Sequence, residues 1–254
     1  MEDKSTFWNH LEVLRWALFR VVCVVIVCMV GTFLTMPYIF DQYILAPTTG
    51  NFFVYQWLSD ISNGLFTFNP NYSVDIININ VTSQFLTHIK TSISLALVIA
   101  FPYFVFEAWK FIRPALYENE VKRLRFIFCG STIMFYIGCL VAYLLIFPFT
   151  FRFLTEYELS SHITNQIDLS SYIGTFTMLI MIMGIVFEMP ILAWLLSCFG
   201  IINKQILKRY KREAIVAMLI LSAIITPSGD PFTLLLVFAP LYLLYELSIL
   251  VVKR

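Results

Sequence analysis

Charged residues are scarce in this chain, and their scarcity argues against a soluble fold. Only 13% of the 254 residues are Asp, Glu, Lys or Arg, whereas an average soluble domain has about a quarter. Hydrophobic residues make up 59% of the chain, and Phe alone accounts for 25 positions. A chain with this composition is expected in a lipid bilayer.

The patterns that mark many enzymes and metalloproteins are also missing. The cysteines are five in number, all lie in apolar runs and show no Cys-x-x-Cys spacing, so we interpret them as packing residues. His10, His88 and His162 are far apart in the sequence and predict no metal site. No Gly-x-x-x-x-Gly-Lys-Ser/Thr loop is present to bind a nucleotide. We therefore expect no cofactor, no enzymatic activity and no nucleic-acid partner.

The chain does contain a series of apolar runs. Most of them reach the ~20 residues that a helix needs to cross ~30 Å of hydrocarbon. The predicted spans are 17–39, 89–109, 126–149, 169–199, 214–226 and 232–250. No internal repeat is evident. We predict an all-α integral membrane protein with six transmembrane helices in one domain, residues 1–254.

The basic residues predict the orientation of these spans. Of the 17 Lys and Arg residues, 15 precede the first run or lie near its start, lie in the second-to-third and fourth-to-fifth connections, or follow the last run. Only Lys90 and Arg152 remain for the other face. The positive-inside rule then places both termini in the cytoplasm. The first run follows an acidic start and ends without a small-x-small site, so we do not interpret it as a cleaved signal peptide.

Local patterns predict further elements around the spans. Residues 5–16 carry apolar side chains at helical spacing and predict a short amphipathic helix along the membrane surface. In the long first external connection, the aromatic segment 52–58 predicts an interfacial or capping helix, and the alternation in 77–81 predicts an extended segment. The fifth run covers only about 20 Å, so the last hairpin must thin the bilayer, lie obliquely or pack away from lipid. A re-entrant hairpin without a mechanical role is the alternative.

Two carboxylates interrupt apolar runs and are functional candidates, because a charge within a span is costly. Glu188 lies about 18 Å from the inner end of its run, and Pro190 beside it should kink the helix. This combination predicts a polar concavity in the membrane; a protonated Glu188 bonded to a neighbouring helix is the simpler alternative. Glu246 is the lone acid of the last run. Arg20 lies near the start of the first run, where we expect it to reach the headgroups.

A second group of acids lies in the first cytoplasmic loop. Glu118 and Glu120 stand at the base of the third helix, where the helix dipole alone explains at least one of them. A sharper hypothesis requires a cationic partner. Two adjacent guanidinium groups would need planar carboxylate acceptors at this border between water and lipid.

Five blocks of the sequence resemble those of the twin-arginine translocase subunit family TatC, in the same order. They are His10-Leu-Glu-Val-Leu-Arg15, Leu45-Ala-Pro47, Phe111 to Glu120, Phe187-Glu-Met-Pro190 and Thr226 to Glu246. The resemblance implies a cupped, six-helix receptor of the bacterial cytoplasmic membrane. Such a receptor binds the twin-arginine signal peptides of folded precursors. It self-associates in a larger complex with TatA- and TatB-type single-span proteins, and the proton-motive force drives transport.

The resemblance also implies roles for single residues. Glu120 matches the family's loop glutamate that contacts the arginine pair, and Arg15 matches the N-terminal arginine of the same region. Glu188 matches the concave-face glutamate. Asp230 matches the acid of the external turn, and Pro47 the external-loop proline.

One position departs from the family pattern. The second acid of the N-terminal signature is Val13 in this chain. Glu12 is retained, but it points about 100° away around a helix. Either Glu12 substitutes for the missing acid, or Glu120 carries most of the recognition.

Two other classes of function compete with this interpretation. A proton-coupled small-solute transporter would use Glu188 and Glu246 as titrating sites, but the lack of a repeat and the short fifth run count against it. A membrane hydrolase would need a Ser/His pair or a metal cluster, and the sequence shows no such pattern.

Overall fold

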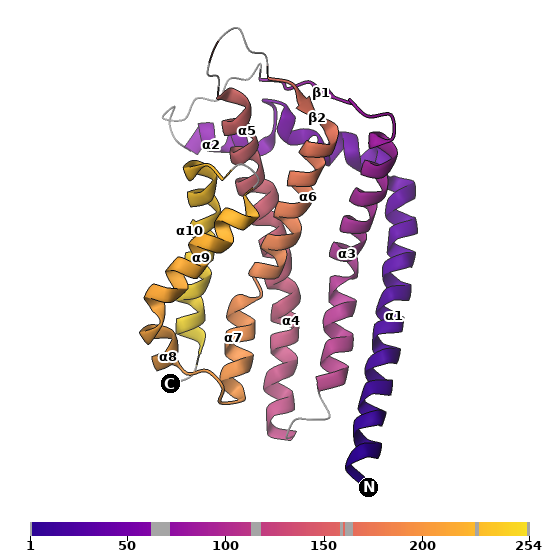
Figure 1. The fold of residues 1–254 in the computed structure, drawn as a ribbon, viewed down its shortest axis with the longest axis vertical. Helices are drawn as coiled ribbons and strands as arrows, with labels where there is room; N and C mark the ends of the chain where they lie inside the picture. The colour runs from indigo at the N-terminus through magenta and orange to yellow at the C-terminus, as the bar shows by residue number, and fades with distance from the viewer. Residues whose placement is uncertain are drawn as a thin grey trace.

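The computed structural model describes residues 2–61, 72–112, 118–157, 160, 165–226 and 229–252. It is a bundle of long helices, as Figure 1 shows, with both chain termini toward its lower end and two short strands at its upper end. We name the lower end the basal end and the upper end the apical end. The predicted all-α class is confirmed.

Helices account for nearly all of the regular structure in the described residues. They are α1 (Glu2–Ile39), α2 (Phe53–Ile61), α3 (Ser83–Ile112), α4 (Glu118–Val141), α5 (Phe147–Glu156), α6 (Leu169–Val186), α7 (Met189–Cys198), α8 (Lys204–Arg209), α9 (Lys211–Ile225) and α10 (Pro231–Val251). The π-helical turns η1 (Phe40–Ile44) and η4 (Ala142–Ile146) and the 3₁₀ turn η2 (Ala46–Thr48) extend α1 and α4. Strands β1 (Ile76–Ile77) and β2 (Ile167–Asp168) pair in parallel.

Much of the outer surface is apolar, as a membrane requires. Among the described residues, five helical segments are long and apolar enough to cross a bilayer: Leu11–Thr48, Ser83–Phe111, Cys129–Glu156, Leu169–Cys198 and Pro231–Val251. Val27 and Leu34 of α1 are 71% and 76% exposed, which is costly in water and favourable in lipid. The short fifth run forms α9, which is not one of these five, so the count of six spans stays a prediction.

Helix α1 runs without a break toward the apical end, so the separate surface helix predicted for residues 5–16 is wrong. No proline or glycine lies between Glu2 and Val30 to end a helix there. The amphipathic segment therefore continues directly into the span. The upper part of α1 is tied to α3, because the Thr32 hydroxyl donates a 3.0 Å hydrogen bond to the Ser92 carbonyl oxygen.

A proline within α1 explains the position of His88 on α3. Pro37 has no N–H to donate to the carbonyl of Phe33, one turn earlier. His88 Nε2 lies 2.9 Å from that carbonyl oxygen and donates to it. Its ring also stacks on Phe33, with the two centroids 3.9 Å apart. Because lipid supplies no donor, the histidine replaces the missing N–H.

Helix α3 repeats this arrangement one helix further along. Pro102 leaves the carbonyl of Val98 without its helical donor. The Tyr136 hydroxyl of α4 donates to that oxygen at 3.2 Å. Each of these two prolines thus creates an acceptor that a neighbouring helix satisfies, and each acceptor joins two helices.

The kink predicted at Pro190 is confirmed. Helix α6 ends at Val186, Phe187 and Glu188 form a turn, and α7 begins at Met189. The buried Pro190 lies in the first turn of α7, where its missing N–H costs little. The predicted run 169–199 is therefore two helices with Glu188 between them.

The apical end is closed by α2, which confirms the predicted capping helix at 52–58. Tyr55 is 1% exposed, and its hydroxyl lies 3.3 Å from the Pro47 and 3.2 Å from the Pro148 carbonyl oxygen. Burial raises the pKa of Tyr55, which keeps this hydroxyl a donor. The buried Arg152 guanidinium lies 5.0 Å from the Tyr55 ring and donates to Glu156. The extended segment predicted at 77–81 is only the two-residue strand β1, which overlaps it at Ile77.

Helices α4 and α6 approach each other closely at two glycines. A Cβ on Gly138 would lie 2.6 Å from the backbone oxygen of Met183, and one on Gly184 would lie 2.7 Å from the Phe135 ring. Small residues let helix backbones pack in a membrane, where no hydrophobic force drives helices together.

We predict that Gly138→Ala destabilises the protein by about 1–3 kcal/mol, because the added methyl group must displace a helix backbone. Gly130→Ala is the matched control on the same helix, since its Cβ would meet only the Ile191 Cδ1 at 3.9 Å. Thermal unfolding of both purified variants in detergent measures the difference. Equal midpoints for the two variants would contradict this packing.

Candidate functional site

Glu188 occupies the turn between α6 and α7 and is half-buried. Its Oε2 accepts a 2.7 Å hydrogen bond from the Ser131 hydroxyl of α4. Its Oε1 is buried and has no hydrogen-bond partner among the described residues. The carboxyl group therefore offers one unsatisfied oxygen inside an apolar bundle, where a polar partner would be strongly favoured.

Glu12 and Arg15 lie on the basal part of α1 and form an ion pair at 3.7 Å. Their side chains are 60% and 72% exposed, so the pair contributes little to stability and leaves both groups accessible. Val13 between them is also exposed. This surface presents one carboxylate and one guanidinium beside apolar side chains.

Glu120 lies in the first turn of α4, at the basal end. Its side chain is outside the described part of the structure, as is the preceding loop 113–117. An acid at this position is favoured by the positive end of the helix dipole.

A partly buried ion pair that the sequence analysis missed links α1 to α3. Arg20 Nε and Nη2 donate to the two carboxylate oxygens of Glu107, at 3.0 and 2.7 Å. The Tyr103 hydroxyl donates to Glu107 Oε1 at 3.0 Å. The carboxylate holds the planar fork of Arg20. The expectation that Arg20 reaches the headgroups stays a prediction. Glu107 lies in the predicted span 89–109, so the rule that selected Glu188 could have found it.

Glu246 is not a lone acid in the folded protein. It forms an ion pair with Lys211 at the start of α9, and the Lys211 ammonium lies 5.4 Å from the centre of the Tyr242 ring. A carboxylate held by an ammonium group favours its charged form. This pairing weighs against Glu246 as a proton carrier in a solute transporter.

Pro47 and Asp230 have structural contacts. Pro47 is buried in η2 and its carbonyl receives the Tyr55 hydroxyl. Asp230 caps α10, because its carboxylate accepts the Thr233 N–H at 2.8 Å. Both residues therefore shape turns. The structure brings Glu12 and Arg15 together but gives Glu188 and Glu246 different partners.

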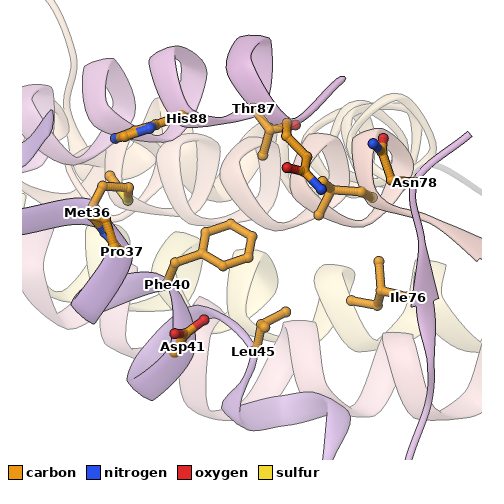
Figure 2. A pocket seen from close by; sticks show the side chains of 11 residues that line it. Met36, Pro37, Phe40, Asp41, Leu45, Ile76, Asn78, Thr87 and His88 are labelled. Atoms are coloured by element: carbon orange, nitrogen blue, oxygen red, sulfur yellow. The ribbon is translucent and has the colours of Figure 1, made fainter. Parts of the chain in front are cut away.

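A cavity of about 400 Å³ at the apical end shows no convergent catalytic groups among its described lining residues. Figure 2 shows the Phe40 ring between Asp41 and His88, which lie on opposite sides of the cavity. His88 is already bonded to the Phe33 carbonyl. An acid and an imidazole in this arrangement cannot act together on one substrate atom.

Comparisons with known proteins agree with the sequence resemblance. The family model of the Sec-independent protein translocase protein (TatC) matches residues 9–240. The Sec-independent protein translocase protein TatC of Blattabacterium sp. subsp. Periplaneta americana is 33% identical over 255 residues, covering 98% of this chain and 95% of the relative. The protein of the same name from Helicobacter pylori (strain ATCC 700392 / 26695) is 39% identical over 191 residues, 74% of each chain.

A crystal structure of a twin arginine translocase receptor, TatC, has the same fold. The TM-score is 0.74 at 28% identity, covering 95% of this chain and 97% of the other. Its structure in DDM gives a TM-score of 0.77 at the same identity. Together with the apolar helices, these similarities identify a multi-pass membrane protein. The chain belongs to the TatC family of Sec-independent protein translocase proteins.

Proposed function

We propose that this protein is the receptor and core subunit of a twin-arginine export system. It binds the twin-arginine signal peptides of folded precursors and moves them with TatA- and TatB-type partners, driven by the proton-motive force. The observation that carries this proposal is the match of the family model to residues 9–240. The similarity to a solved twin arginine translocase receptor over 95% of the chain supports it.

The proposed membrane is the bacterial cytoplasmic membrane, with both termini in the cytoplasm. The ends of the chain, the C-terminal end of α3, the N-terminal end of α4 and α8 lie toward the basal end in Figure 1, and most of the basic residues are in or next to these segments. The positive-inside rule favours a cytoplasmic basal end.

Signal recognition is proposed at that basal end. Glu120 is the main acceptor for the arginine pair, because a carboxylate binds a guanidinium through two parallel hydrogen bonds. Glu12 and Arg15 extend this surface along α1. Glu12 is accessible for such a contact, since its present ion pair is long and exposed.

The Arg20–Glu107 pair is proposed to fix the position of the α1 segment that carries Glu12 relative to the end of α3 that leads to Glu120. Arg20 lies eight residues from Glu12, about 12 Å along α1. Glu107 lies near the basal end of α3, which leads directly into the loop before Glu120. A fixed contact between α1 and α3 therefore sets how Glu12 and Glu120 face one signal peptide.

Beyond the recognition surface, the apolar part of the signal is proposed to follow a concave face past Glu188. The unsatisfied Oε1 of that residue offers an acceptor to a polar group of the signal. The hairpin of α9 and α10 is proposed to thin the bilayer locally. Helix α9 has 15 residues, about 22 Å at helical rise, which is less than the ~30 Å hydrocarbon core.

Deletion of the gene tests the function directly. We expect a folded reporter with a paired-arginine leader to remain in the cytoplasm of the deletion strain and to be exported again when the gene is restored. The same reporter with paired lysines should be exported poorly in both strains. Normal export of the paired-arginine reporter without the gene would refute the proposal.

Glu120→Lys is expected to abolish signal-peptide crosslinking, because it places like charges together. We expect the crosslinking yield to fall about tenfold or more, because placing like charges together at an interface is costly. Photocrosslinking of a radiolabelled precursor to the purified protein measures it. Glu118→Lys, two residues away in the same helical turn, is the matched control and should retain crosslinking. Unchanged crosslinking in Glu120→Lys would remove this residue from the site.

Charge reversal at the Arg20–Glu107 pair tests its positioning role. Arg20→Glu and Glu107→Arg should each lower the thermal midpoint by several degrees and weaken signal binding, because each leaves like charges facing one another. The double variant R20E/E107R should recover both properties. The exposed pair supplies the control, since R15E/E12R should leave the midpoint unchanged. No recovery in R20E/E107R would contradict the positioning role.

A further inference from the structure

A groove between α3 and α6 lies outside the surfaces described so far. The two helices pack side by side in the bundle (Figure 1). One cavity of about 470 Å³ lies between them near the apical end, and a second of about 430 Å³ adjoins it. Ser94, Thr177 and Met181 line both cavities. We name the two adjoining cavities together the α3–α6 groove.

One end of the α3–α6 groove is polar and basic. Its lining includes Lys90 and Ser94 from α3, and Ser171 and Thr175 from α6. Lys90 lies seven residues from the apical start of α3, about 10 Å along the helix. Its ammonium approaches α6, because a Cβ on Gly174 would lie 3.6 Å from Lys90 Nζ. The absence of a side chain at Gly174 gives the ammonium this room.

The hydrogen-bond donors at this end are not matched by acceptors of the described residues. No carboxylate in this part of the chain lies within ion-pair distance of Lys90, unlike Arg20 or Lys211. Asp168 caps α6 by accepting the backbone N–H groups of Ser170 and Ser171 and does not line the groove.

The hydroxyl groups of this end fall into two kinds. Those of Ser94 and Thr177 donate to carbonyls of their own helices. Ser171 and Thr175 line the space beside Lys90 and contribute two further hydroxyl groups to its lining. A charged group with several acceptor oxygens matches this set.

The other end of the groove is apolar. Ile39, Leu95, Val98, Ile99 and Ile180 are among the side chains that line it. Val98 and Ile99 lie eight and nine residues beyond Lys90 along α3, about 12–13 Å further from the apical end. The cavity lined by Lys90 thus adjoins an apolar cavity whose α3 lining lies further from the apical end.

We propose that the α3–α6 groove binds an anionic phospholipid of the apical leaflet. Its phosphate accepts hydrogen bonds from the Lys90 ammonium and from the Ser171 and Thr175 hydroxyls, and one acyl chain fills the apolar end. Charge complementarity selects the phosphate, and the amphipathic lining selects a lipid over a free anion. A bound lipid also covers the seam between α3 and α6. This site is separate from signal recognition at the basal end.

The test uses the purified, delipidated full chain in detergent, with native mass spectrometry to count bound lipid. Dioleoylphosphatidylglycerol is the probe. Dioleoylglycerol, which lacks the phosphate, and glycerol 3-phosphate, which lacks the chains, are the comparison compounds. We expect one tightly retained phosphatidylglycerol and no retention of either comparison compound. Equal retention of dioleoylglycerol, or displacement of the lipid by equimolar glycerol 3-phosphate, would overturn the proposal.

Variants locate the binding in the groove. Lys90→Gln should weaken phosphatidylglycerol binding about fivefold, the effect of one basic residue at an anionic surface. Lys90→Arg should retain it. Lys110→Gln removes a charge from the opposite end of the same helix and should leave this lipid bound. Gly174→Leu fills the space beside Lys90 Nζ and should also weaken binding, with folding checked by the thermal midpoint.

Two results would refute the assignment. Unchanged lipid binding in Lys90→Gln and Gly174→Leu, with both variants folded, would place the lipid elsewhere. If these variants instead lost a co-purifying single-span protein while lipid binding stayed constant, the occupant would be a partner helix with an acidic side chain.

Discussion

Polar groups inside the apolar helices must find partners within the protein, because hydrocarbon offers none. Glu107 binds Arg20, 87 residues away, and the Phe33 carbonyl freed by Pro37 accepts from His88, 55 residues away. Apolar side chains could pack in many registers with similar energy, whereas these bonds form in only one. The polar pairs therefore fix which helices are neighbours and how they are aligned.

Ligands are proposed to bind where a polar group lacks a partner among the described residues. Glu188 keeps one buried oxygen free in the turn made by Pro190, and Lys90 directs its ammonium into the α3–α6 groove. Glu246, by contrast, is matched by Lys211. An unmatched polar group within a bilayer is costly, so a protein retains it at low cost only if a ligand supplies the missing partner.

Much of the fold could be predicted from the sequence, but the partners of its polar groups could not. The helical nature of the apolar runs, the kink at Pro190 and the helix at 52–58 depend on local composition, and these predictions are confirmed. The separate surface helix at 5–16 was not, because amphipathic spacing does not show where a helix ends. Glu107 was overlooked for a similar reason: its importance depends on Arg20, which is close only after α1 and α3 have packed.

Composition and short-range order are enough to place the chain in a membrane, to locate its helices, to show which connections carry the basic residues and to reveal the family it resembles. These properties depend only on which residues are present and on their order along the chain. The folded bundle was needed to learn that Arg20 neutralises Glu107, that Lys211 neutralises Glu246 and that Lys90 has no acid beside it among the described residues. Charge pairing acts over a few ångströms in space, and those distances are set only when the helices pack.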